Sequence, residues 1–199
     1  MRIVVVGATG TVGKVVVAAL QARHDVVKVG HRGGDLMVDI ADGNSIRRLY
    51  ERIGRFDTVV ATVGKVHFGD FAALTDKEVK VGLDNKLMGQ VNLVLLAREH
   101  INDGGSFTLT SGVLSHDPIR SGACASLVNG AIDAFVRAAA IELRRGLRIN
   151  SVSPRLLDES ASALGAYFPG HETVPGSRVA RAYVKSVEGG LTGQTFHVL

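Results

Sequence analysis

The sequence predicts one doubly wound α/β domain, with about seven mostly parallel strands and helices on both faces of the sheet. Short strand-like runs alternate along the chain with segments whose apolar residues recur at the helical period. The strand-like runs are continuously apolar, which is typical of parallel strands that are buried on both faces. Strand–helix–strand units of this kind are right-handed and build a parallel sheet. No linker, low-complexity tract or repeat divides residues 1–199, so we expect a single domain.

In the first third of the chain the predicted elements follow one another closely. The opening apolar run is followed by a helical segment with Val12, Val16 and Leu20 on one side, and Ile46 and Leu49 share one side of a second such segment. The predicted strands are 2–6, 26–29, 36–38 and 57–62, and the predicted helices are 11–23 and 44–53.

A capping box, Thr75-Asp76-Lys77-Glu78, predicts the start of the next helix, because its Thr and Glu side chains can accept hydrogen bonds from N–H groups at a helix start. This helix is expected to run, with or without a break, to about residue 100. The remaining predicted elements are a strand at 106–110, an Ala-rich helix at 122–145, a strand at 147–152, a helix at 176–187 and a strand at 194–198.

Composition and charge exclude several classes of protein. The chain is 46% hydrophobic and 21% charged, which is ordinary for a globular domain. The single Cys124 cannot form an internal disulfide, and no Cys/His cluster has zinc-ligand spacing, so we expect no metal and a reducing, cytoplasmic location. No stretch approaches the roughly 18 unbroken apolar residues of a membrane span, so we expect no membrane association. The net charge of +4 is scattered rather than gathered on one segment, which argues against nucleic-acid binding and leaves open a basic cleft for an anionic small molecule.

A glycine-rich turn, Gly7-Ala8-Thr9-Gly10-Thr11-Val12-Gly13, joins the first predicted strand to the first helix. Glycines at this point permit a tight turn, close approach of the backbone to a diphosphate, and close packing of helix on strand. The helix N-terminus adds free N–H groups and a positive dipole. The sequence therefore predicts a dinucleotide site in a Rossmann-type fold, and the residues expected around the diphosphate are Gly7, Thr9, Gly10, Thr11, Val12 and Gly13.

The second predicted strand ends in Val29-Gly30-His31-Arg32, beside the expected position of the adenosine ribose. An acidic residue there would accept hydrogen bonds from the ribose hydroxyls, whereas an arginine suits a 2′-phosphate. We therefore predict NADP(H) as the cofactor in preference to NAD(H), with Arg32 holding the phosphate and His31 beside it.

Taken together, these motifs resemble those of the short-chain dehydrogenase/reductase superfamily over essentially the whole chain. Arg148-Ile149-Asn150-Ser151-Val152-Ser153-Pro154 is similar to its sixth-strand signature, Leu191-Thr192-Gly193-Gln194 to its closing strand, and Thr110-Ser111 falls at its serine-bearing strand end. Asp39 falls at its adenine-contacting Asp, while Ala61-Thr62-Val63-Gly64 retains only the final Gly of its Asn-Asn-Ala-Gly stretch. The resemblance implies further cofactor contacts at Asp39, Ile40, Ala61, Thr62, Val63, Gly64 and Pro154, in a shortened member trimmed after Pro154.

The catalytic pattern of that family is only partly present. The resemblance implies a Ser, which is Ser111, and a Tyr-x-x-x-Lys pair, whose positions hold Cys124 and Val128. The family's Asn position matches Lys86, although Asn85 is adjacent and a slip of one residue would place it there. We interpret Cys124 as a packing residue, because no basic partner stands at helical spacing from it.

Three explanations of this departure remain open. Lys86 could stabilise a developing oxyanion with Ser111 and donate a proton, if desolvation lowers its pKa. A loop residue, His67, His116 or Tyr167, could donate instead, or no reduction could occur at all.

The leading hypothesis is an NADP(H)-dependent oxidoreductase that moves hydride to or from a small carbonyl or alcohol substrate, with Ser111 and Lys86 nearest the chemistry. The alternative is a catalytically silent NADP(H)-binding sensor or scaffold. Small side chains on the helices near 83–100 and 122–145, and the pairing of these helices in the family, lead us to expect a homodimer or homotetramer.

Overall fold

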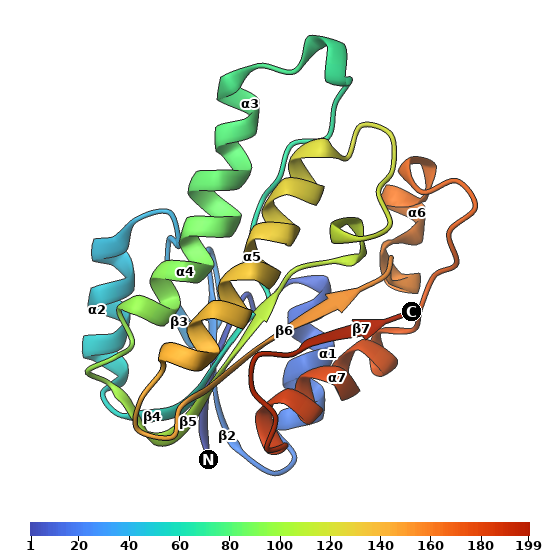
Figure 1. Cartoon of the computed structure of the whole chain (residues 1–199). Coiled ribbons are helices and arrows are strands. Elements are labelled where there is room, and N and C mark those ends of the chain that lie inside the picture. The colour runs from blue at the N-terminus through green and yellow to red at the C-terminus, as the bar shows by residue number, and fades with distance from the viewer.

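The fold is built on one parallel seven-stranded sheet, seen in the computed structural model, which describes residues 1–199 (Figure 1). The strand order is β3-β2-β1-β4-β5-β6-β7, and every neighbouring pair is parallel. The chain reverses its direction of strand addition between β1 and β4, so that the switch point lies at the centre of the sheet. The strands are β1 (Arg2–Val6), β2 (Asp25–Gly30), β3 (Leu36–Met37), β4 (Phe56–Ala61), β5 (Ile101–Thr110), β6 (Arg148–Pro154) and β7 (Thr195–Val198).

Helices cover both faces of this sheet and enclose two hydrophobic cores. The smaller core of 14 buried residues lies under α1 (Thr11–Leu20) and α7 (Gly176–Glu188), and the larger core of 23 lies under the helices of the other face. Those helices are α2 (Gly43–Ile53), α4 (Met88–Leu95) and α5 (Ala123–Glu142). Helix α3 (Asp76–Val81) precedes α4 and has no buried residue. The prediction of a doubly wound parallel sheet is therefore confirmed.

The predicted helix from residue 75 is interrupted at its middle. Its N-terminus is the predicted capping box, since the Thr75 hydroxyl accepts from the Glu78 N–H and the Glu78 carboxylate accepts from the Thr75 N–H. Residues Gly82–Leu87 then form a π-helical turn between α3 and α4. A π-turn inserts an extra residue into the helix and rotates the side chains that follow.

Strand β5 begins five residues before its predicted start at 106. The sequence Asn102-Asp103-Gly104-Gly105 is polar and small, so it lacks the apolar pattern on which the prediction rested. In the structure the pairing with β4 shifts register after Ile101, and Gly104 takes a φ of 72° at the irregularity. The segment 155–175, which was predicted to be loop, contains α6 (Ala161–Leu164) flanked by two single 3-10 turns, and Tyr167 ends the second of them.

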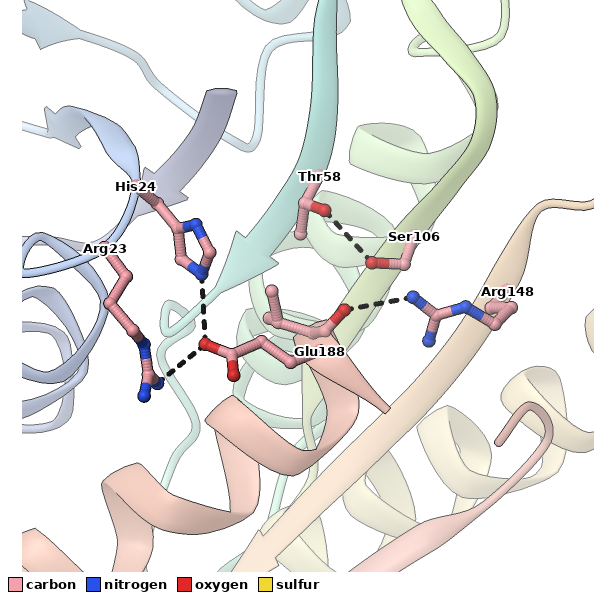
Figure 2. Close-up of polar contacts among 7 residues, drawn as sticks. Arg23, His24, Thr58, Ser106, Arg148 and Glu188 are labelled. Carbon is pink, nitrogen blue, oxygen red and sulfur yellow. Dashed lines mark hydrogen bonds and ion pairs between the residues drawn. The ribbon is translucent and has the colours of Figure 1, made fainter. Parts of the chain in front are cut away.

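Charged side chains fix the C-terminal end of α7 near the first residue of β6. The Arg148 guanidinium donates to the carbonyls of Ser186 and Val187 at 2.9 and 3.0 Å. Figure 2 shows one of these two contacts beside Glu188, which accepts from Arg23 at 2.7 Å and contacts the His24 ring at 3.0 Å. The hydrogen bond to His24 is the main cause that holds the pKa of Glu188 below its usual value, and the positive charge of Arg23 adds to it.

Helix α5 is long and apolar enough, by length and composition alone, to cross a bilayer. In the structure it lies along β6 and buries seven of its residues, including two polar ones, Asn129 and Asp133. Core helices of folded domains pass the same test of length and composition, and the packing of α5 is that of a core helix.

Candidate active site

Two cavities lie side by side at the carboxyl edge of the sheet and share Val63 and Gly64 as a common wall. The first, of about 420 Å³, lies over the ends of β1 and β2 and is lined by Gly7, Gly30 and Asp39 among others. The second, of about 320 Å³, lies over the ends of β4, β5 and β6 and contains Lys86 and Ser111. In open parallel sheets, ligands bind outside the carboxyl ends of the strands at the switch point.

The glycine turn fits a diphosphate. Gly7 has a φ of 90°, and a Cβ there would stand 2.5 Å from the Thr62 carbonyl oxygen. A Cβ on Gly13 would collide with the Gly7 carbonyl. Helix α1 can therefore lie this close to the end of β1 only when residue 13 is glycine. Helix α1 has no side-chain cap and no acidic residue in its first turn. Its first N–H groups and its positive dipole are therefore available to an anion.

The structure brings most of the other predicted cofactor residues to these two cavities. His31, Asp39 and Ile40 line the first, while Val12, Thr62 and Pro154 line the second. Arg32 is exposed at the end of β2 and lies outside both linings.

Ala61 differs from the other predicted contacts because its side chain lies in the core. It is fully buried and lies outside both cavities, and its carbonyl accepts from the Thr110 hydroxyl at 2.5 Å. Ala61 is the last residue of β4 and its side chain lies in the larger core. The first residue of this stretch that lines a cavity is therefore Thr62.

Lys86 projects from the π-turn into the second cavity. Its ammonium donates to the Ser111 carbonyl at 2.8 Å and to Asn129 Oδ1 at 2.6 Å. Removal from water lowers the pKa of Lys86 from its usual 10.5 to about 8, against an opposing effect of the Asp133 charge. An ammonium with three N–H donors and two protein acceptors keeps one donor for a ligand.

The two adjacent side chains Asn85 and Lys86 of the π-turn line different cavities. Asn85 points to the first cavity, where its Oδ1 accepts from the Lys65 N–H at 2.8 Å. Lys86 points to the second. The stem of Lys86 passes so close to Gly64, which has a φ of 134°, that any Cβ there would collide with it.

Ser111 stands at the end of β5 beside the lysine. The residue is 3% exposed, and its N–H donates to the Val152 carbonyl at 3.0 Å. Its hydroxyl lies 3.5 Å from the same carbonyl, which is a weak contact that a better acceptor can replace. The next residue, Gly112, has a φ of 150° and leaves room for the Asn129 amide.

The positions of the missing tyrosine and lysine are occupied by buried packing residues. Cys124 is 3% exposed, and burial raises the pKa of its thiol, which makes it a poor nucleophile. Val128 is fully buried in the larger core and its methyl group packs against Gly82 of the π-turn.

The three loop residues considered as proton donors lie outside the second cavity. His67 lies 3.5 Å from the Glu78 carboxylate, and His116 packs edge-on against His197. Tyr167 stacks on Phe68, whose ring does line the cavity.

Sequence reasoning missed two side chains that organise the site. Asn129 holds Lys86, and the Gln90 amide bridges the carbonyls of Val63 and Thr110 while accepting from the Thr110 N–H. A signal for Asn129 was present, because Asn129 and Asp133 stand four residues apart in a mostly apolar, Ala-rich helix. Polar residues at that spacing share one face.

Comparison with known proteins agrees with this geometry. A family model described as enoyl-(acyl carrier protein) reductase matches residues 3–185. A short-chain dehydrogenase/reductase of Pestalotiopsis microspora is 26% identical over 156 residues, covering 74% of this chain and 59% of the relative. An uncharacterized oxidoreductase of Methylorubrum extorquens is 25% identical over 175 residues, covering 85% and 64%. The chain thus spans less than two thirds of the length of these curated relatives.

Solved structures extend the similarity to the whole chain. The protein lin1944 from Listeria innocua is 44% identical with a TM-score of 0.99, and each chain covers the other completely. A small-chain dehydrogenase in complex with NADPH is 26% identical with a TM-score of 0.86, and the match covers 100% of this chain and 96% of the dehydrogenase chain.

Proposed function

Because the chain belongs to the short-chain dehydrogenase/reductase superfamily, we propose that it is an NADP(H)-dependent oxidoreductase that uses Lys86 in place of the family's tyrosine. One observation carries the proposal. The Lys86 ammonium lies in the cavity beside Ser111, held by two acceptors, with its pKa lowered to about 8. A group that titrates near neutral pH is suited to give or take a proton.

The residues around the diphosphate turn would hold the cofactor along the two cavities. The α1 N-terminus would bind the diphosphate, Asp39 and Ile40 would flank the adenine, and Arg32 is free to meet a 2′-phosphate. A small-chain dehydrogenase of similar structure binds NADPH, which supports this choice of cofactor. A bound nicotinamide supplies hydride to a carbonyl carbon.

The chain's own groups complete the reaction at the carbonyl oxygen. The Ser111 hydroxyl and the free N–H of the Lys86 ammonium stabilise the negative charge that develops there. As the C–H bond forms, an N–H proton of Lys86 passes to the oxygen, which leaves an alcohol and a neutral amine. Solvent then returns a proton to the amine. Oxidation of an alcohol runs through the same groups in reverse.

The first test measures turnover and binding separately. With NADPH and a panel of small aldehydes and ketones, we expect wild-type protein to consume NADPH, and Lys86→Met to lower kcat by about 100-fold or more while NADPH still raises Tm. Ser111→Ala should lower kcat as well. Lys77→Met, an exposed lysine on α3, is the matched control and should leave kcat unchanged.

Two results would contradict the proposal. Turnover that survives in Lys86→Met would exclude the lysine as proton donor. Tight NADPH binding without turnover of any carbonyl would instead favour a silent cofactor-binding protein.

The second test concerns cofactor choice. Arg32→Ala should weaken NADPH binding by about tenfold, because a charge-assisted contact to the 2′-phosphate is lost, and should leave NADH binding unchanged. Titration calorimetry with both cofactors checks this. An equal loss for both cofactors would show that Arg32 does not read the 2′-phosphate.

A further inference from the structure

A second cation lines the cavity that holds Lys86. Arg155 follows Pro154 directly, at the point where β6 ends, and its side chain forms part of the wall. Lys86 and Arg155 are the only charged residues in the lining, which contains no carboxylate. The cavity therefore presents two positive groups to whatever enters it.

The hydrogen-bonding capacity of Arg155 is largely unused. Its Nε atom is buried without a partner. The carboxylate with which it forms an ion pair, Glu172, lies 4.0 Å from one terminal nitrogen and is 90% exposed. An ion pair of this length to an exposed group contributes little. A buried donor without a partner is costly to a fold and calls for a ligand or another acceptor.

The rest of the wall restricts what the acceptor can be. The cavity lining includes the apolar side chains of Val66, Phe68, Leu114, Leu156 and Phe168, and its volume of about 320 Å³ suits a small molecule. The planar fork of a guanidinium matches the two oxygens of a carboxylate. An anionic end beside Arg155 and an apolar body against these side chains would fill the cavity.

We infer that Arg155 is a specificity residue, and that the substrate is a small oxo acid, or the corresponding hydroxy acid, whose carboxylate binds the Arg155 guanidinium. This inference rests on the proposed function, since it places the reacting carbonyl at Lys86 and Ser111. Lys86 acts on the carbonyl oxygen, and Arg155 orients the substrate from its other end. The two cations have different tasks, because the Lys86 ammonium already has two acceptors from the chain and Arg155 has none that is buried.

The experiment uses substrate pairs that differ only in charge. The probes are 2-oxobutanoate, 3-oxobutanoate and 4-oxopentanoate, each matched with its methyl ester, and the readouts are kcat/KM with NADPH and calorimetric binding to the NADP⁺ complex. We expect wild-type protein to prefer at least one acid over its ester. Arg155→Met should lower kcat/KM for that acid by about tenfold to 100-fold through KM, and should hardly change the ester.

Two further variants serve as controls. Arg155→Lys keeps the charge without the planar fork and should retain part of the preference. Arg47→Met removes an exposed arginine of α2 and should change neither substrate.

The outcomes separate this inference from the proposed function. Acid binding that is lost in Arg155→Met, without any turnover in wild-type protein, would support the anion site and overturn the oxidoreductase. Turnover of acids and esters with equal efficiency in wild-type protein would overturn the anion site and leave the oxidoreductase standing. If Arg155→Met weakens NADPH binding and leaves the acid preference intact, the arginine serves the cofactor diphosphate and the inference is wrong.

Discussion

At the residue scale, the site depends on a lysine whose surroundings make its ammonium easy to deprotonate. The Lys86 ammonium is buried away from water, which lowers its pKa, and its two acceptors from the chain are neutral. The Asp133 carboxylate is the one charge that raises this pKa. Asp133 itself accepts from the hydroxyls of Ser151 and Thr195, so its charge is shared with its own partners. Desolvation therefore dominates, and the direction of the shift follows from it.

This shift predicts how the rate depends on pH. The protonated form of Lys86 predominates below its pKa of about 8, and only that form can donate. The value of kcat/KM for carbonyl reduction should therefore be flat below pH 7 and fall about tenfold per pH unit well above pH 8. Alcohol oxidation should rise through the same region, because it requires the neutral amine.

A pH–rate profile of Ser111→Ala provides the control, since it should be slower but keep the same inflection. Arg cannot be deprotonated in this range, so Lys86→Arg should lose the inflection. A wild-type profile without any change between pH 7 and 9 would contradict the assignment.

At the scale of elements, the end of α7 is fixed by a residue from another element. Arg148 on β6 donates to two of the last carbonyls of this helix, which have no partner within the helix itself. The contact joins β6 to α7 at the edge of the sheet away from the cavities.

Arg148→Met should therefore lower the free energy of unfolding by about 1–3 kcal/mol, because two charge-assisted hydrogen bonds to partly buried carbonyls are lost. Urea denaturation checks this. Arg178→Met, an exposed arginine in the first turn of the same helix, should change stability by less than about 0.5 kcal/mol. Equal stabilities of the two variants would show that the contact does not hold the helix end.

Elements also show where prediction from the sequence succeeds and where it ends. Continuous apolar runs such as Ile3–Val6 predict the central strands, because burial on both faces leaves no other pattern. The π-turn leaves no such pattern. Val128 lies close to Gly82 of the turn and the stem of Lys86 lies close to Gly64, and both contacts join segments that are remote in the sequence. Lys86 and Ser111 could be proposed together because each stands at a position of the family's catalytic pattern. No such pattern marks Arg155, and the only signal for Asn129 was its spacing from Asp133.

At the scale of the whole molecule, α4 and α5 leave apolar surface uncovered. Met88, Leu95, Leu127 and Ile141 are between 39% and 87% exposed on these two helices. A groove of about 450 Å³ lies between them, lined in part by Phe135 and Leu143. Apolar surface of this kind marks interaction sites, and we propose that a second copy of the chain covers it.

Ile141→Asp should then shift the protein toward a smaller species, because it places a charge at the most exposed of these apolar positions. Sedimentation equilibrium or light scattering measures the mass. Met37→Asp, at another exposed apolar position, on the edge strand β3, is the control and should keep the wild-type mass. A monomeric wild-type protein would exclude the interface.

The burial of Cys124 and Val128 has a consequence for any variant that introduces the family's tyrosine and lysine at these positions. Cys124→Tyr and Val128→Lys would enlarge two side chains that have almost no room, since Cys124 is 3% exposed and Val128 is fully buried. The new ammonium would enter an apolar layer beneath the π-turn, one position from the amide that already holds Lys86. Burying an uncompensated charge is strongly unfavourable. The double variant with Lys86 unchanged should therefore destabilise the packing of α5 against the π-turn, and should not gain the proton donor of the family's Tyr–Lys pair.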